Sequence, residues 1–406
     1  MEGAKQPFCF NYVEGKVMVR VASLFSQLLG QVQRVEFAAL VAKHKAERGA
    51  KGFTCWTQFV AMLFCQVGKA DSLRDICNGL ACAEGKLVHL GVSTAPNKST
   101  LSYANEHRPA ALYEDLFWAL LGRFRGQGAL PGCRKPRFRF KNKLLSLDTT
   151  TVSLCLGMFP WASFRRAKGG VKVHVLLDHD DYMPAWVLVT EARRHELKVA
   201  QGLKLNPGSI VAMDKGFVDY DLFGRWTDEG VYFVTRIKDN AVYEVTEERD
   251  VPWRGNVQSD QVIHLTGARA CPHPLRRVVV HDPDQDRDIV LLTNHLGLGS
   301  TTIGAIYKDR WEIEVFFKTL KQNLKVKTFV GTSENALRIQ IWTALVALLL
   351  LRWLHHLSRA GWSFSNLAAM LRLNLFTYRD LLAWLANPFG TPPIVPGGQQ
   401  LALALS

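Results

Sequence analysis

Four side chains near residue 310 have the types and the spacing to bind a metal ion next to a phosphate. The spacing is Y-x2-R-x3-E-x6-K, formed by Tyr307, Arg310, Glu314 and Lys321. In a single helix from about Thr302 to Lys325, with roughly 100° of rotation per residue, they fall within an arc of about 60°. A stripe with one carboxylate, two cations and a phenol is poorly suited to burial and well suited to a phosphate with its metal ion.

Two upstream aspartates could supply the remaining metal ligands. Asp148 follows the apolar run Leu144–Leu147, and Asp214 follows Ser209–Met213. Both runs predict strands, and open α/β sheets bind ligands at strand ends. Carboxylate oxygens are the ligands that Mg²⁺ prefers. We therefore expect Asp148, Asp214 and Glu314 to converge on one cation site.

Such a site would suit the cleavage of a phosphodiester bond. Two divalent ions roughly 3.5–4 Å apart can activate the attacking oxygen and stabilise the leaving oxygen. Each acid also has an ordinary interpretation when taken alone. Asp148 and Asp214 could be turn residues at strand ends, and Glu314 could simply pair with Arg310 four residues earlier.

The apolar patterns predict the elements that would position these groups. After the strand before Asp148, strands are expected at Val171–Leu177 and Ala185–Thr190. Helices and strands then alternate, over His195–Leu205, Ser209–Met213, Asp219–Gly230 and Val231–Thr235. Three consecutive strands followed by this alternation are the order of a ribonuclease H-like α/β core.

Short apolar runs between Lys238 and Ser300 predict a β subdomain inserted into that core, because about 60 residues are too many for a plain loop. The runs are Val242–Val245, Val262–Leu265, Val278–Val280 and Ile289–Leu292. The predicted organisation has five parts. They are a helical DNA-end-binding region (1–133), the first part of the core (134–240), the insertion (241–300), the core helix with Glu314 (301–330), and a C-terminal helical region with a tail (331–406).

The charge balance indicates a polyanionic partner. The 406 residues carry a formal net charge of +14, and nucleic acid is the usual partner of such a basic protein. The segment Arg134–Lys143 alternates basic and aromatic residues and could follow a phosphate backbone, or could be a solvated linker. The helices of residues 1–133 fit DNA-end binding and a dimer contact about equally well.

The compartment expected for this chain is the bacterial cytoplasm, associated with the nucleoid. The eight cysteines form no CxxC pair, and the first residues show no signal-peptide pattern. The longest apolar run, Ile341–Leu351, is too short to span a bilayer.

The quartet Tyr307, Arg310, Glu314 and Lys321 resembles the YREK signature of bacterial DDE insertion-sequence transposases of insertion-sequence family four. The resemblance covers most of residues 10–330. It includes the segments Trp56–Val60, Ser72–Ile76, Lys98–Arg108, Leu147–Thr150, Phe159–Gly169, Lys172–His174 and Val234–Lys238. The chain departs from the common family pattern at Asp214-Lys-Gly-Phe217 and at His195-Glu196. These departures leave the triad carboxylates in place, and the resemblance does not carry over the DNA contacts at these two segments.

The resemblance implies a function and assigns roles to residues. Asp148, Asp214 and Glu314 would be the catalytic, metal-binding DDE triad, using Mg²⁺, or Mn²⁺ as a substitute. Tyr307, Arg310 and Lys321 would contact DNA phosphates, with Arg166 and Lys172 as further DNA contacts. The enzyme would cut the terminal inverted repeats through hairpin intermediates and join the 3′-OH ends to target DNA as a homodimer.

Trp253 is the one tryptophan between Lys238 and Ser300. In relatives a tryptophan of the β insertion holds a base flipped out of the hairpin, so Trp253 is a candidate for this contact. It could equally cover a small β core. Two other functions fit the same sequence features, namely a catalytically silent DNA-binding regulator of transposition and a ribonuclease H-like nuclease that only hydrolyses.

Overall fold

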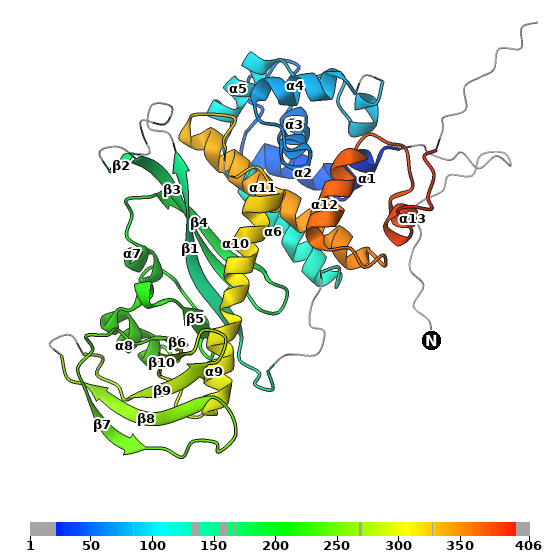
Figure 1. Ribbon diagram of the computed structural model, residues 1–406. Helices are drawn as coiled ribbons and strands as arrows, with labels where there is room; N and C mark the ends of the chain where they lie inside the picture. Colours follow the sequence, from blue (N-terminus) through cyan, green and yellow to red (C-terminus); the bar gives the residue numbers. More distant parts are fainter. Residues whose placement is uncertain are drawn as a thin grey trace, which may run out of the picture.

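The computed structural model describes residues 22–83, 85–130, 138–154, 159, 161, 163–165, 168–267, 270–326 and 328–394. Figure 1 shows a helical region built from both ends of the described chain, and a sheet region built from its middle. The yellow helix α10 (Trp311–Asn323) runs between them. The apolar core of the helical region is continuous with one face of the sheet, because residues of α10 pack on both.

In the described part of the chain, six helices and a 3₁₀ turn precede the sheet. They are α1 (Leu24–Leu29), α2 (Arg34–Lys43), α3 (Cys55–Gly68), α4 (Leu73–Ala81), η1 (Leu87–Leu90), α5 (Lys98–His107) and α6 (Ala111–Gly126). The Ser72 hydroxyl accepts the Asp75 amide and caps α4. Helix α5 begins at Lys98 and follows Asn97, whose side chain makes no capping hydrogen bond.

The described strands form one ten-stranded sheet with the order β2-β3-β1-β5-β6-β10-β9-β8-β7, and β4 pairs with β3. Its first half contains β1 (Leu144–Leu154), β2 (Ser163–Arg165), β3 (Lys168–Asp178), β4 (Met183–Glu191), β5 (Ile210–Met213) and β6 (Tyr232–Arg236). Strand β1 is antiparallel to β3 and parallel to β5, and β5 is parallel to β6.

Helix α7 (Glu196–Ala200), the turn η3 (Lys215–Phe217) and α8 (Tyr220–Asp228) lie between strands of this half. The sequence predicts a longer helix, to Leu205, in place of α7. The chain instead turns at Gln201 and Gly202.

Strands occur at all four positions predicted between Lys238 and Ser300. They are β7 (Tyr243–Glu248), β8 (Val257–Leu265), β9 (Leu275–Asp282) and β10 (Arg287–Thr293). They extend the main sheet, because β10 pairs antiparallel with β6 through Leu291, Leu292 and Thr293. These four strands therefore widen one sheet from six described strands to ten.

The predicted single helix over Thr302–Lys325 is divided in two. Helix α9 (Ser300–Asp309) ends just before Arg310, and α10 starts just after it. Arg310 keeps helical dihedral angles (φ −50°, ψ −29°), so the interruption is a local joint. The face beside the polar stripe is apolar and buried, and it comprises Ile306, Ile313, Phe316, Phe317, Leu320 and Leu324.

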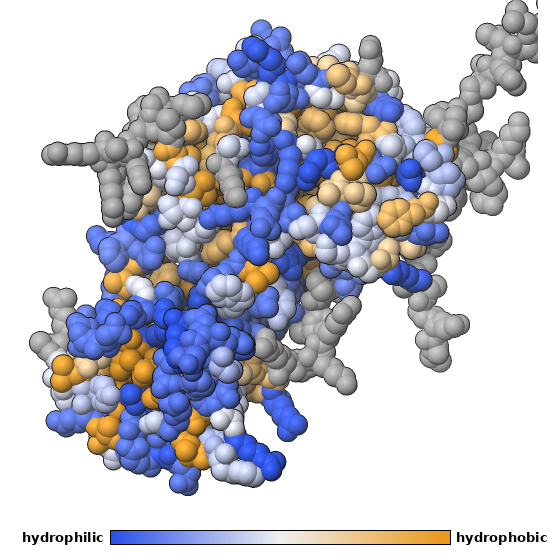
Figure 2. All heavy atoms as spheres, viewed as in Figure 1, coloured by the Kyte–Doolittle hydropathy of each residue, from blue (hydrophilic) through white to orange (hydrophobic). Residues whose placement is uncertain are grey.

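The C-terminal helices complete the helical region. They are α11 (Glu334–Leu357), α12 (Phe364–Leu373) and α13 (Leu381–Ala386). Helix α11 is long and apolar enough to cross a membrane, but 83% of its most apolar window is buried inside the protein, against α3, α5 and α6. Figure 2 shows hydrophilic residues over much of the face in view, with hydrophobic ones in scattered groups.

Candidate active site

The parallel pairing of β1 with β5 brings the two aspartates to neighbouring positions. Its last registered pair is Leu147 with Met213, so Asp148 and Asp214 follow at the same level of the sheet. The sequence places Asp148 at the end of a strand, and this is wrong. Strand β1 continues to Leu154 because Thr149 and the residues after it still pair with β3.

The Asp148 carboxylate lies in a low-dielectric setting. Burial raises the pKa of Asp148 to about 6, although the Thr149 amide, which donates to it over 2.7 Å, and the positive charge of Arg310 act in the opposite direction. The nearby charges of Glu314 and Asp214 raise this pKa further. A buried carboxylate with two acidic neighbours favours an added cation.

Asp214 faces a guanidinium group. Burial acts to raise the pKa of Asp214. The hydrogen bonds from Arg236, at 2.9 Å, and from the Lys215 amide, together with the charges of Arg236 and Arg310, outweigh burial and lower this pKa below its ordinary value. Arg236 is the last residue of β6, beside β5 in the sheet. The side chains of Asp214 and Arg236 are 40% and 34% exposed, so solvent and ligands can reach the pair.

Glu314 lies on the first turn of α10 and accepts a hydrogen bond from Arg310 at 2.8 Å. Arg310 is largely buried, with 12% of its side chain exposed, and lies 5.5 Å from the centroid of the Tyr307 ring. Its charge acts on Asp148 and on Asp214 as well. Arg310 therefore connects all three predicted triad residues electrostatically.

The three acids are neighbours without forming a ready metal cage. Across the described residues, no group of three or more His, Cys, Asp or Glu side chains is gathered closely enough to hold an ion. Arginine pairing gives the physical reason, because Arg236 and Arg310 each bind one of the three carboxylates. Sequence reasoning gave no role to Arg236, although it lies in the Val234–Lys238 segment.

A cavity of about 760 Å³ lies beside these groups, with Tyr307, Arg310 and Arg236 in its wall. It is bounded by α9, by the β9–β10 hairpin and by Gly255, which is two residues after Trp253 in the sequence. Trp253 is 84% exposed and has the Arg254 guanidinium 4.0 Å from its ring centroid. Its exposure rules out the alternative that it covers a β core.

The other predicted DNA contacts have different surroundings. Lys321 lies 3.4 Å from the Thr151 carbonyl oxygen of β1. Lys172 is mostly buried and pairs with Glu196 at 3.0 Å. Arg166 lies outside the described residues. In the basic segment, Phe138 and Phe140 stack with ring centroids 4.9 Å apart and pack against the core.

Comparison with known families identifies the family of this chain. The family described as "Transposase DDE domain" matches residues 139–350, slightly more than half of the chain, and "Domain of unknown function (DUF4372)" matches residues 20–93. The chain belongs to the DDE transposase family. The family implies a metal-dependent enzyme that cleaves DNA, and the sequence-based expectation of a DDE transposase is confirmed.

Relatives agree with this assignment. A protein of Sinorhizobium fredii named as transposase y4zB is 30% identical over 334 residues, which cover 79% of this chain and 90% of the relative. A protein of Geobacillus stearothermophilus, named as a transposase for insertion sequence element IS5377, is 34% identical over 53% of this chain and 58% of its own length. A protein of Synechocystis, named as a transposase for element IS4SA, is 27% identical over 65% and 73%.

Proposed function

We propose that this DDE transposase belongs to the YREK-signature group and moves an insertion sequence by cut and paste. It would bind the terminal repeats as a homodimer, cleave them through hairpin intermediates, and join the 3′-OH ends to target DNA. One observation carries the proposal. Asp148 of β1, Asp214 after β5 and Glu314 of α10 all lie within electrostatic range of Arg310.

The sheet order supports a ribonuclease H-like core. In the half β4-β3-β1-β5-β6, the first two pairings are antiparallel and the last two parallel. This order places the C-terminal ends of β5 and of the parallel part of β1 side by side, where a substrate of an α/β sheet binds. We assign 134–240 and 301–330 to this core, 241–300 to an inserted β subdomain, 1–133 to DNA-end binding and 331–406 to the C-terminal helical region.

The donor set fits two magnesium ions. Asp148, Asp214 and Glu314 offer oxygen ligands alone, which Mg²⁺ prefers and Mn²⁺ accepts. When bound, such ions activate the attacking oxygen and stabilise the leaving oxygen. Burial raises the pKa of Asp148 to about 6, so a cation bound beside this carboxylate would stabilise its charged form.

The chain's own cations would position the DNA. Arg310 and Arg236 lie in the cavity wall and each pairs with one of the acids, so they would offset the repulsion between a DNA phosphate and the carboxylates. Tyr307 adds a phenol, and Lys321 a charge near Thr151. Trp253, whose ring is exposed and which lies two residues before Gly255 of the cavity wall in the sequence, would stack on a flipped base.

Strand cleavage of a labelled terminal repeat tests the proposal. Asp148→Ala, Asp214→Ala and Glu314→Gln should each abolish cleavage with Mg²⁺ or Mn²⁺ and leave end binding largely intact. Denaturing gels should show a hairpin before the joined product. Cleavage at the normal rate by any of these variants would overturn the triad.

Two outcomes would replace the proposed reaction. Binding without any cleavage by the wild-type protein would indicate a silent regulator of transposition. Cleavage that never yields hairpins or joined products would indicate a hydrolytic nuclease of the same fold.

A further inference from the structure

A buried hydrogen-bonded chain connects the sheet to the joint between α9 and α10. The His179 ring lies 2.7 Å from the Ser146 hydroxyl through Nε2 and 2.7 Å from Asp309 through Nδ1. Ser146 is fully buried, and 5% of the His179 and 2% of the Asp309 side chains are exposed. Since an ionised Asp309 only accepts, Nδ1 carries a proton, and in the neutral ring Nε2 accepts from Ser146.

Both end residues of this hydrogen-bonded chain, Ser146 and Asp309, are close in sequence to residues of the candidate site. Ser146 is two residues before Asp148 in β1, so the two side chains point to the same face of the sheet. Asp309 is the last residue of α9 and directly precedes Arg310. The hydrogen-bonded chain therefore connects β1, which carries Asp148, to Asp309. Asp309 is the neighbour of Arg310, which pairs with Glu314.

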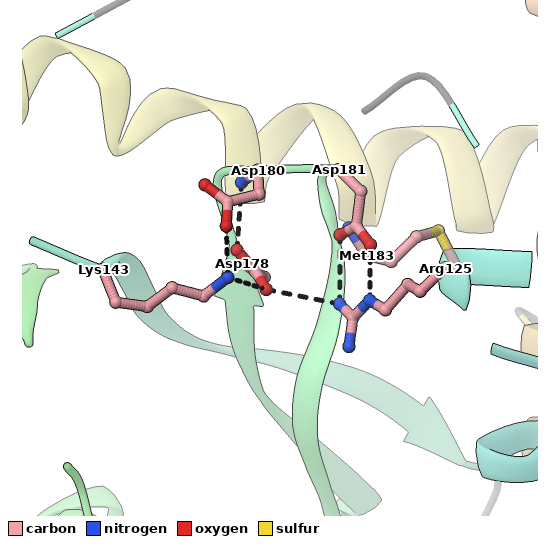
Figure 3. Close-up of polar contacts among 6 residues, drawn as sticks. All are labelled: Arg125, Lys143, Asp178, Asp180, Asp181 and Met183. Atoms are coloured by element: carbon pink, nitrogen blue, oxygen red, sulfur yellow. Dashed lines mark hydrogen bonds and ion pairs between the residues drawn. The ribbon is translucent and has the colours of Figure 1, made fainter. Parts of the chain in front are cut away.

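The turn that carries His179 is itself held from several sides (Figure 3). Arg125 of α6 donates to both oxygens of Asp181, at 2.6 and 3.1 Å. Lys143 lies 2.7 Å from Asp178 and also pairs with Asp180. The His179 amide donates to the Leu144 carbonyl oxygen over 3.1 Å. His179 thus projects from a fixed point between the helical region and the sheet.

We infer that Ser146, His179 and Asp309 are positioning residues that hold the α9–α10 joint, and with it Arg310 and Glu314, against β1. This inference rests on the proposed function for its catalytic consequence. A helix interrupted at Arg310 can bend there, so Glu314 keeps its place relative to Asp148 only if the joint is tied to the sheet. The buried chain supplies that tie across 130 residues of sequence.

The test uses the full-length protein with Ser146→Ala, His179→Gln and Asp309→Asn. Thr293→Val is the matched control, because it removes another buried strand hydroxyl, one that accepts the His295 amide at 3.0 Å. Amide hydrogen exchange over residues 308–314 should become faster in the three variants and stay unchanged in Thr293→Val. Strand cleavage at saturating DNA should fall about 10- to 100-fold, with the half-saturating DNA concentration within about twofold of wild type.

The two readouts separate this inference from the proposed function. Faster exchange in a protein that never cuts DNA would keep the positioning role and reject the transposition reaction. Unchanged exchange at the joint in Ser146→Ala, the mildest variant, would overturn the inference even if the larger substitutions fail to fold. A rise in half-saturating DNA with an unchanged maximal rate would also overturn it, because it would indicate a DNA-binding role.

Discussion

Two arginine–aspartate pairs in the same sheet have opposite environments. In the β7–β10 half, Asp260 and Arg276 form two hydrogen bonds, at 2.7 and 2.5 Å, with 2% and 4% of their side chains exposed. In the half with the candidate site, Asp214 and Arg236 form a 2.9 Å pair with 40% and 34% exposed. A ligand cannot reach the buried pair of Asp260 and Arg276. A ligand can reach Asp214 or Arg236 and take the place of its present partner. The difference in burial therefore separates a pair that solvent cannot reach from one that a ligand can reach.

Asp260→Asn should produce the largest loss of stability, because it leaves the buried Arg276 guanidinium without its charge partner. Breaking a buried pair on one side typically costs about 3–5 kcal/mol. Arg276 also donates to the carbonyl oxygens of Leu296 and Leu298, ahead of α9, so this loop should loosen as well. Urea denaturation measures the effect, and a loss below about 1 kcal/mol would show that the pair is replaceable.

His174 should give the next largest effect, through pH. Its ring is fully buried between the hydroxyls of Thr149 and Thr190, at 2.7 and 2.9 Å. Burial, with the charges of Lys172 and Arg194, lowers the pKa of His174 to about 4. The unfolded chain takes up the proton at about pH 6.5, before the folded chain does, so stability falls as the pH drops from about 6.5 to about 4.

The full size of this pH effect is about 3 kcal/mol, from about 1.4 kcal/mol for each unit of pKa difference. Denaturation curves at pH 7.5, 6.0 and 4.5 should show the loss in the wild type and a flatter dependence in His174→Gln. Since all other titrating groups are shared, equal slopes in the two proteins would contradict the assignment.

The sequence predicts the elements of this fold better than their ends. Strands appear at the predicted positions because their apolar patterns are local. The end of β1 was misplaced, since the polar Thr149–Thr151 run breaks that pattern while it still pairs with β3. The continuity of the sheet depends on the β10–β6 pairing, and no local pattern encodes a contact between distant strands.

The candidate site was predictable where residues have a characteristic spacing, as in the quartet around Glu314. Arg236 and the Ser146–His179–Asp309 chain were not, because they come together from different strands and helices. The spacing also gave no sign of the joint at Arg310, which keeps helical dihedral angles.

Asp214→Asn should affect stability much less than Asp260→Asn does. Half-exposed ion pairs typically contribute about 0–1 kcal/mol, so urea denaturation should change little, whereas cleavage of a terminal repeat should be lost. Asp239→Asn is the matched control, because Asp239 is an exposed partner of Lys215 at 2.8 Å on the same side of the sheet. A large stability loss in Asp214→Asn would make this pair structural, like that of Asp260.

Trp253→Ala should have the smallest effect on folding. A side chain that is 84% exposed contributes within about 0.5 kcal/mol to stability. If its ring stacks on a flipped base, hairpin formation should slow while the first nick proceeds at its normal rate, and Trp253→Phe should restore much of the hairpin step. Phe389→Ala, which removes another exposed aromatic ring, should change neither step. Equal slowing of the nick and of the hairpin step would indicate that Trp253 contributes to DNA affinity in general and has no particular role in the hairpin step.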